Sequence, residues 1–179
     1  YSHYPTIADP SPAYHNLKFY ETFGHYGFLM KVRAEALRDV GACMSPFNAF
    51  LILQGIETLS VRMERHVQNA LGVAQFLKAH PKVAWVAYAG LPDHPDYELA
   101  KKYLPKGPGA VFSFGIKANG LDPREAGKRF IQNLQIFSHL ANVGDVRSLV
   151  IHPASTTHQQ LSDEELRQAG IAPEMIRLS

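Results

Sequence analysis

The stretch GAVFSFGIKANGLDPRE, residues 109–125, contains the two signals that decide the fold. Its first eight residues are almost entirely apolar, and they predict a strand buried on both faces of a sheet. Asp122 then stands in a helix N-cap position, with Pro123 at the first helical position and Glu125 at the third. These residues predict a helix that runs to about residue 134. A buried strand followed by a capped helix indicates an α/β protein.

The same alternation of strands and helices continues on both sides of this stretch. Apolar runs and capping residues predict the neighbouring elements, which are strands at residues 83–88, 148–151 and 175–178 and helices at residues 96–103 and 162–170. The last of these helices is opened by the capping box Ser-Asp-Glu-Glu at residues 162–165. We expect a small α/β sandwich whose sheet is covered mainly on one side.

The N-terminal part predicts helices and coil without strands. Residues 28–39 have apolar positions at helical spacing, and Gly41 is suited to cap their end. Ser45 and Pro46 begin a second helical stretch, which we expect to form two consecutive helices as far as residue 80. Residues 1–27 contain prolines, glycines and many aromatic residues, and we expect them to be irregular.

Composition excludes several classes of protein. The 179 residues are 46% apolar and 19% charged, which excludes a disordered tail. The formal net charge of +2 is spread along the chain without a basic block, and the apolar runs are far shorter than the roughly 20 residues of a membrane helix. We therefore expect neither a nucleic-acid nor a membrane partner. Cys43 is the single cysteine, which excludes an internal disulfide and favours the cytoplasm.

The ends of the sequence suggest a piece of a longer polypeptide. The first residue is Tyr1 instead of Met, and the last residue, Ser179, directly follows a predicted strand without a turn. We expect this stretch to fold together with the rest of its chain.

Most of the candidate reactive residues have an ordinary structural explanation. The nine histidines lack the spacing of a zinc site, so we expect no metal site. Cys43 is expected to be a small packed side chain, since a lone cysteine more often packs than reacts. The glycines of residues 107–109 precede a strand instead of following one, so they indicate a turn and not a phosphate-binding loop.

Two features remain as candidates for binding. Arg177 lies in an apolar strand, where a guanidinium is costly unless it meets an anion. The pattern alone favours an edge strand in which Arg177 pairs with a local Asp or Glu. The second feature is the polar segment of residues 141–158, a turn, a short strand and a Ser/Thr/His-rich loop, which is consistent with a binding loop.

Three motifs in order resemble one family over nearly the whole chain. They are LRDVGACMSPFNAFLILQGIETLSVRMERH (residues 37–66), NVGDVRSLVIHPASTTH (residues 142–158) and IRLS (residues 176–179). Together they resemble the C-terminal part of O-acetylhomoserine sulfhydrylases, enzymes of cysteine and methionine metabolism that depend on pyridoxal phosphate (PLP). The resemblance implies a fold-type-I PLP-dependent transferase. Residues 1–58 would be the end of its large domain with a linking helix, and residues 59–179 the small C-terminal α/β domain, truncated at its end.

The resemblance also implies roles for three residues. Arg177 matches the arginine that grips the substrate α-carboxylate in this family, and a planar guanidinium matches a carboxylate with two parallel hydrogen bonds. Asn142 matches the position that helps to hold the same carboxylate, and Thr157 matches a threonine that lines the pocket. Asn142 replaces the serine of γ-lyase and γ-synthase relatives, and Ile151 stands where some of them carry glutamine. Both departures favour the O-acetylhomoserine branch.

The cofactor machinery of the family is expected upstream of Tyr1. None of the nine lysines lies in the Ser/Thr-rich motif ending in Thr-Lys that carries PLP in such enzymes. The resemblance therefore implies that this stretch has no catalytic, cofactor-binding or metal-binding residues. By itself it should be inactive and supply substrate recognition.

The activity implied is replacement of the acetate of O-acetyl-L-homoserine by sulfide or a thiol, to give homocysteine or methionine. The resemblance further implies a cytoplasmic homo-oligomer, a dimer of dimers. Two alternatives remain open. One is a relative of cystathionine γ-synthase or methionine γ-lyase, and the other is a non-catalytic module that has lost the cofactor half.

Overall fold

The computed structural model describes residues 3–179, which form two compact units, residues 3–55 and residues 56–179. Helix α5 (Pro46–Glu57) crosses the boundary between them. The expected domain division after residue 58 stays a prediction. None of the described helices combines the length and the apolar character needed to cross a membrane.

The first unit is built from short helical segments. They are α1 (Pro5–Ala8), η1 (Pro12–Tyr14), α2 (Phe19–Phe23), η2 (Gly24–Tyr26), α3 (Gly27–Val32), the π-helical turn η3 (Arg33–Leu37) and α4 (Arg38–Val40). The expectation that residues 1–27 are irregular is wrong for residues 3–27, while residues 1 and 2 lie outside the described residues. Pro5 and Pro12 start helical turns there, because a proline at the first position lacks only an N–H that would be unpaired anyway.

The helix expected over residues 28–39 is confirmed as the continuous run from α3 to α4. Gly41 ends it with a φ of +69°, a left-handed conformation that glycine adopts without steric cost. Phe19 is buried beneath this run, and the ring of Tyr14 meets it edge to face at 5.6 Å between centroids.

Helix α5 starts where its N-cap predicts. The backbone N–H of Asn48 donates to Oγ of Ser45 at 3.2 Å, and Pro46 occupies the first helical position. Large apolar side chains stand exposed all around the helix, namely Phe47, Phe50, Leu51, Ile52, Leu53 and Ile56. A helix that is apolar on every side is typical of a helix buried in a larger assembly.

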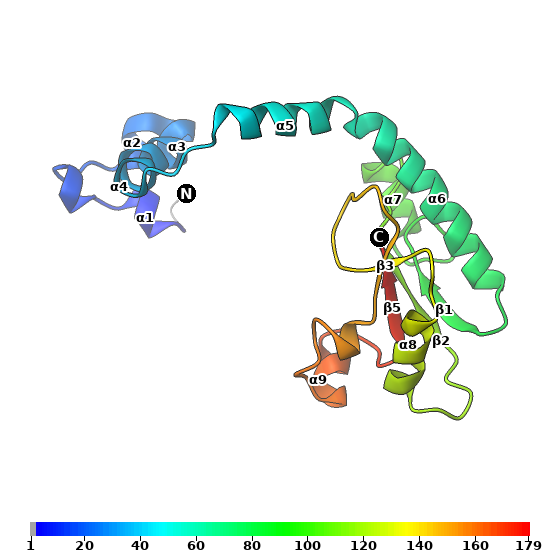
Figure 1. The fold of residues 1–179 in the computed structure, drawn as a ribbon. Coiled ribbons are helices and arrows are strands. Elements are labelled where there is room, and N and C mark those ends of the chain that lie inside the picture. Colours follow the sequence, from blue (N-terminus) through cyan, green and yellow to red (C-terminus); the bar gives the residue numbers. More distant parts are fainter. Residues whose placement is uncertain (1–2) are drawn as a thin grey trace. The chain divides into compact units, whose positions relative to one another are not determined.

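The second unit is an α/β domain, as the alternation of strands and helices predicts. Its elements are α6 (Leu59–Ala79), β1 (Val83–Ala87), α7 (Tyr97–Tyr103), β2 (Phe112–Ile116), α8 (Pro123–Gln132), β3 (Ser138–His139), β4 (Leu149–Ile151), η4 (Pro153–Ser155), α9 (Asp163–Gln168) and β5 (Met175–Leu178). Figure 1 shows them in chain order from green to red. Strand β3 is two residues long and escapes a prediction by periodicity.

The predicted N-caps of α8 and α9 are both present. The carboxylate of Asp122 accepts a hydrogen bond from the N–H of Glu125 at 3.0 Å at the start of α8. At the start of α9, the hydroxyl of Ser162 accepts from the N–H of Glu165, and the Glu165 carboxylate accepts from the N–H of Ser162 at 2.8 Å. These local bonds explain why both helices start at the expected residues.

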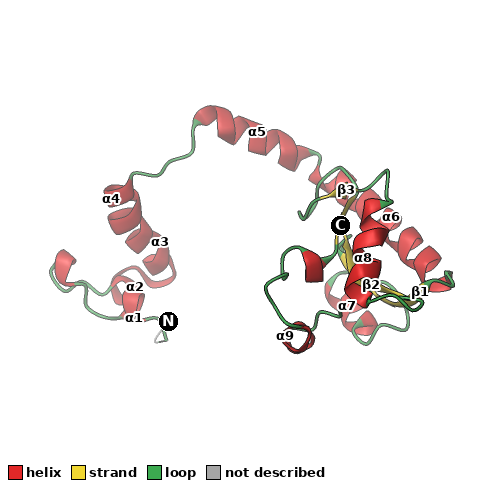
Figure 2. Cartoon of the chain, turned by 60° about the horizontal axis from the view of Figure 1, so that its bottom comes forward, coloured by secondary structure: helices red, strands yellow, loops and turns green. Residues whose placement is uncertain are grey.

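The sheet has the strand order β1-β2-β5-β4-β3, in which only the pair β3 and β4 is parallel. Helices α6 and α8 pack against one face (Figure 2). The core on that face combines Ala70 and Ala74 of α6, Phe130 and Ile131 of α8, and the strand residues Phe112, Phe114, Val150, Ile176 and Leu178. A sheet with its main apolar cluster on one face matches the expectation, and it leaves the other face available for a site.

Candidate functional site

Arg177 lies in the middle of the sheet. Strand β5 has β2 on one side and β4 on the other, and Arg177 is paired with Ser113 and with Ile151. Because side chains alternate along a strand, Ile176 and Leu178 are buried in the core while Arg177 lies on the opposite face. The interpretation of β5 as an edge strand is therefore wrong. A four-residue strand carries no local signal of how many neighbours it will have.

A pocket of about 480 Å³ covers this position. Its floor follows one row across the sheet, through Ala87, Ser113, Arg177 and Ile151, which lie in register on adjacent strands. The walls come from Val111, Phe112, Pro153, Thr157, His158, Ile171 and Met175. This is a common size for a ligand pocket. Among the described residues that line it, Arg177 is the only Lys, Arg, Asp or Glu.

The guanidinium of Arg177 has no acidic partner within residues 3–179. It makes a single hydrogen bond there, from Nη2 to the backbone carbonyl oxygen of Asn142 at 3.4 Å. The alternative interpretation, an ion pair with a local Asp or Glu, is therefore wrong. The remaining guanidinium N–H groups can donate to an anion in the pocket, and a carboxylate matches the planar fork.

Asn142 opens the turn that brings its carbonyl to Arg177. The turn needs Gly144, whose φ is +75°, and Asp145, whose carboxylate accepts from the N–H of Arg147 at 2.9 Å. That bond holds the pKa of Asp145 below its ordinary value, and the amide of Asn142 donates to the same carboxylate at 3.4 Å. Asn142 thus contacts Arg177 through its backbone, while its side chain faces the turn. Its role in binding a carboxylate stays a prediction.

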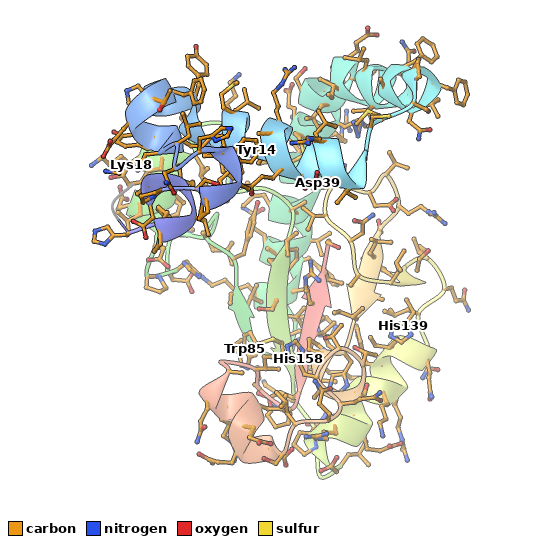
Figure 3. All side chains as sticks on the ribbon, turned by 90° about the vertical axis from the view of Figure 1, so that its left-hand side faces the viewer. Tyr14, Lys18, Asp39, Trp85, His139 and His158 are labelled. Carbon is orange, nitrogen blue, oxygen red and sulfur yellow. The ribbon has the colours of Figure 1, made fainter. Side chains whose placement is uncertain are left out.

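Thr157 and Arg177 line the same pocket, although they are far apart in the sequence. Thr157 is in the loop between η4 and α9, next to His158, which is labelled in Figure 3. Oγ1 of Thr157 and Nδ1 of His158 are 2.8 Å apart, so the two side chains orient one another. The structure therefore brings two of the three predicted residues into one pocket and the third into contact with Arg177.

A buried histidine fixes the base of this loop. His152 is 1% exposed, and its Nε2 donates to the carbonyl oxygen of Pro173 at 2.7 Å. Since a carbonyl oxygen only accepts, Nδ1 is the unprotonated nitrogen and accepts from the hydroxyl of Ser155 at 2.8 Å. Gly127 of α8 lies against the ring, and a Cβ there would collide with it. His152 is a packed histidine with a structural role.

We expect His152 to make the stability of this domain depend on pH. Burial lowers its pKa, with Arg124, Lys128 and His139 adding to the effect and the bond to Pro173 opposing it. The folded state therefore binds fewer protons than the unfolded state below about pH 6.5. This contribution to stability is complete above that pH and is lost as the pH falls through the window below it.

The measurement is the apparent melting temperature of the complete protein from pH 8 to pH 5, beside that of His152→Gln. The wild type should lose more stability than the variant as the pH falls. Parallel profiles would show that His152 is protonated in the folded state as readily as in the unfolded one.

A second pocket, of about 240 Å³, lies beside α6 and contains Arg62, Arg65 and Arg147. Two of these groups already have partners. Arg147 is 3.7 Å from the carboxylate of Asp145, and Nε of Arg62 donates to the hydroxyl of Thr58 at 3.4 Å. The pocket over β5 is the better candidate, because its one charged group is partly buried and has no counter-ion among the described residues.

Ser113, Ile171 and Met175 are pocket residues that the sequence reasoning missed. Ser113 stands between two buried phenylalanines in β2. Because side chains alternate along a strand, Ser113 lies on the face of the sheet opposite the core. The alternation can be recognised in the sequence, but the strand register that sets Ser113 beside Arg177 cannot. Ile151 was singled out by the resemblance, and it lies directly opposite Arg177.

The donors of the pocket fit a substrate carboxylate, but they do not complete a PLP site. A PLP site needs a lysine for the aldehyde and donors for a phosphate. Among the described residues that line the pocket there is no lysine, and Arg177 is the only permanently charged donor. Nor do three His, Cys, Asp or Glu side chains gather as metal ligands anywhere in residues 3–179.

Comparison with known proteins places the chain in a family. The sequence profile described as Cys/Met metabolism PLP-dependent enzyme matches residues 13–179. The chain belongs to this family. Over 176 residues it is 54% identical to O-acetyl-L-homoserine sulfhydrylase 1 of Thermus thermophilus and 49% identical to homocysteine synthase of Schizosaccharomyces pombe. These matches cover 98% of this chain and 41% and 40% of the relatives, so the chain spans about two fifths of their length.

A solved member of the family has the same fold. The crystal structure of a putative O-acetylhomoserine (thiol)-lyase from Campylobacter jejuni superposes with a TM-score of 0.84 at 44% identity, covering 99% of this chain and 41% of that one. Its pyridoxyl-lysine lies outside the part that this chain covers. The resemblance read from the three motifs and the fold-type-I class are both confirmed.

Proposed function

We propose that this chain is the substrate-carboxylate-binding part of a PLP-dependent O-acetylhomoserine sulfhydrylase. The observation that carries the proposal is the guanidinium of Arg177, which lies on the central strand at the floor of a pocket without an acidic partner in the described chain. The names of the relatives support the choice of O-acetyl-L-homoserine as the amino-acid substrate.

In this proposal the chain's own residues bind and orient the substrate. Arg177 donates two hydrogen bonds to the α-carboxylate, and the turn opened by Asn142 holds the guanidinium from the other side. Thr157 limits the position of the substrate at the pocket wall. When bound, PLP would supply an electron sink for the α-carbon of the substrate. Residues outside the stretch 1–179 would hold the cofactor. The net reaction exchanges acetate at the γ-carbon for sulfide or a thiol.

The test is an assay of the complete protein with PLP, O-acetyl-L-homoserine and sulfide. We expect homocysteine and acetate in equal amounts, and we expect residues 1–179 alone neither to bind PLP nor to turn over. Cystathionine formation from cysteine, or α-ketobutyrate release without sulfide, would identify a γ-synthase or γ-lyase instead. A complete protein without a Thr-Lys motif or PLP absorbance would be a non-catalytic module.

The proposal extends to the partners of the chain. The exposed apolar side chains around α5 support burial of this helix against the rest of its own chain or against a second subunit. We propose a homo-oligomer, a dimer of dimers, with residues 1–58 belonging to the large domain and residues 59–179 to the small one. A cytoplasmic location is supported by the lone cysteine, Cys43, although its side chain is exposed and the expectation that it is packed is wrong.

A further inference from the structure

The loop between β4 and α9 forms the wall of the pocket that faces Arg177. Residues 156–161 of this loop are turns without regular secondary structure, and they include Thr157 and His158. The loop has a few internal hydrogen bonds, such as that from the N–H of His158 to the carbonyl oxygen of Pro153 at 2.9 Å. A wall built from such turns keeps its shape only if its two ends are held.

Arg124, in the first turn of α8, holds both ends. Its Nη1 donates to the carbonyl oxygen of Ala154 at 3.2 Å, before Thr157, and its Nη2 donates to that of Leu161 at 2.8 Å, after His158. Nε donates to the carboxylate of Asp163, also at 2.8 Å, at the start of α9. One guanidinium thus bridges the entry of the loop, its exit and the helix that follows.

The arrangement requires an arginine. A guanidinium directs its N–H groups outward in one rigid plane, so it can reach three acceptors at once from a single position. The side chain of Arg124 is 26% exposed, and both of its bonds to carbonyl oxygens are partly buried. A lysine keeps the charge but has one ammonium group, which cannot span carbonyl oxygens on both sides of the loop.

We infer that Arg124 is a positioning residue for the substrate pocket. It keeps residues 154–161 in the conformation that sets Thr157 and His158 opposite Arg177, without touching the substrate itself. The inference rests on the proposed function, because it assigns Arg124 to the site where the α-carboxylate would bind. His152 holds the start of the same loop by its bond to Pro173. Arg124 holds the residues that follow, from Ala154 to Leu161.

The experiment compares Arg124→Lys with Arg129→Lys in the complete PLP-bound protein. Arg129 is on the same helix and makes an exposed ion pair with Glu125 at 3.1 Å, so it is a matched control. For Arg124→Lys we expect the KM for O-acetyl-L-homoserine to rise on the order of tenfold. We expect its kcat and its PLP absorbance to stay near the wild-type values. The control variant should match the wild type in all three quantities.

Hydrogen exchange provides a readout that does not depend on activity. In the complete protein, the amides of residues 154–161 should exchange faster in Arg124→Lys than in the wild type or in Arg129→Lys, while strand β5 keeps its protection. Unchanged exchange in this loop would overturn the inference. So would an unchanged KM in a protein that turns over O-acetyl-L-homoserine, or a loss of kcat at constant KM, which indicates general damage.

The two proposals fail in distinguishable ways. If the wild type does not use O-acetyl-L-homoserine, the proposed function fails, and hydrogen exchange alone decides whether Arg124 orders the loop. If Arg177→Ala impairs turnover but Arg124→Lys does not raise KM, the carboxylate site stands and the role of Arg124 is refuted.

Discussion

Replacing Arg177 by alanine in the complete protein is expected to lower kcat/KM for O-acetyl-L-homoserine by about 10- to 150-fold. A hydrogen bond to a charged group contributes about 1.5–3 kcal/mol, and the loss of that contribution corresponds to this range. The effect should be large because residues 3–179 offer no second cation at the pocket floor. The absorbance of bound PLP should not change, because the cofactor is held elsewhere.

Two further variants make this result specific. Arg177→Lys keeps the charge but loses the planar fork, so its kcat/KM should lie between those of the wild type and the alanine variant. Arg167→Ala removes an exposed arginine of α9 that lies 3.8 Å from Glu164, and it should behave as the wild type. An alanine variant at position 177 with unchanged kcat/KM would remove Arg177 from the site.

Gly127→Ala is expected to destabilise the domain by about 1–3 kcal/mol. In the middle of an α-helix, replacing glycine by alanine normally stabilises the protein by about 1 kcal/mol. The destabilisation expected for Gly127→Ala is therefore opposite to the effect of helix propensity. The reason is the ring of His152, which a Cβ on Gly127 would overlap. The ring cannot move aside without breaking its bonds to Ser155 and to Pro173.

Gly72→Ala provides the matched control for this prediction. Gly72 is also inside a helix, α6, but apart from its chain neighbours and the nearby backbone of that helix, no described atom comes within 4 Å of a Cβ built there. Its replacement should therefore stabilise the protein by about 0.5–1 kcal/mol. Denaturant midpoints and melting temperatures of the complete protein measure both changes. Equal shifts for the two variants would mean that the contact between α8 and His152 is not tight.

Much of the fold could be predicted because its signals are local. The caps at Asp122 and Ser162 lie within three residues of the groups that they satisfy, and the structure places both helices where these caps predict. The period of two along Met175–Leu178 indicated a strand with Arg177 set apart from its apolar neighbours. The prediction failed at residues 3–27, where prolines that start short helical turns were taken as signs of coil.

The candidate site was only partly predictable, because it depends on strand order. Arg177 was singled out by its charge in an apolar strand, but its role, and the choice of Asn142 and Thr157, came from resemblance to a family. Ser113 contacts Arg177, and Arg124 contacts its three acceptors, across separations of 30 to 64 positions in the chain. No window of the sequence contains both partners of such contacts.

The sequence by itself determined the helices and strands from residue 28 onward except β3 and η4, the caps of α8 and α9, and the membership of a PLP-dependent family. Tertiary structure alone decided that β5 is central, that Arg177 meets no acid among the described residues, and that the loop bonded to Arg124 lines the pocket. The physical reason is the range of the interactions. Helix caps and strand alternation act between near neighbours in the chain, whereas the charge environment of a side chain is set by strands and loops that meet only after folding.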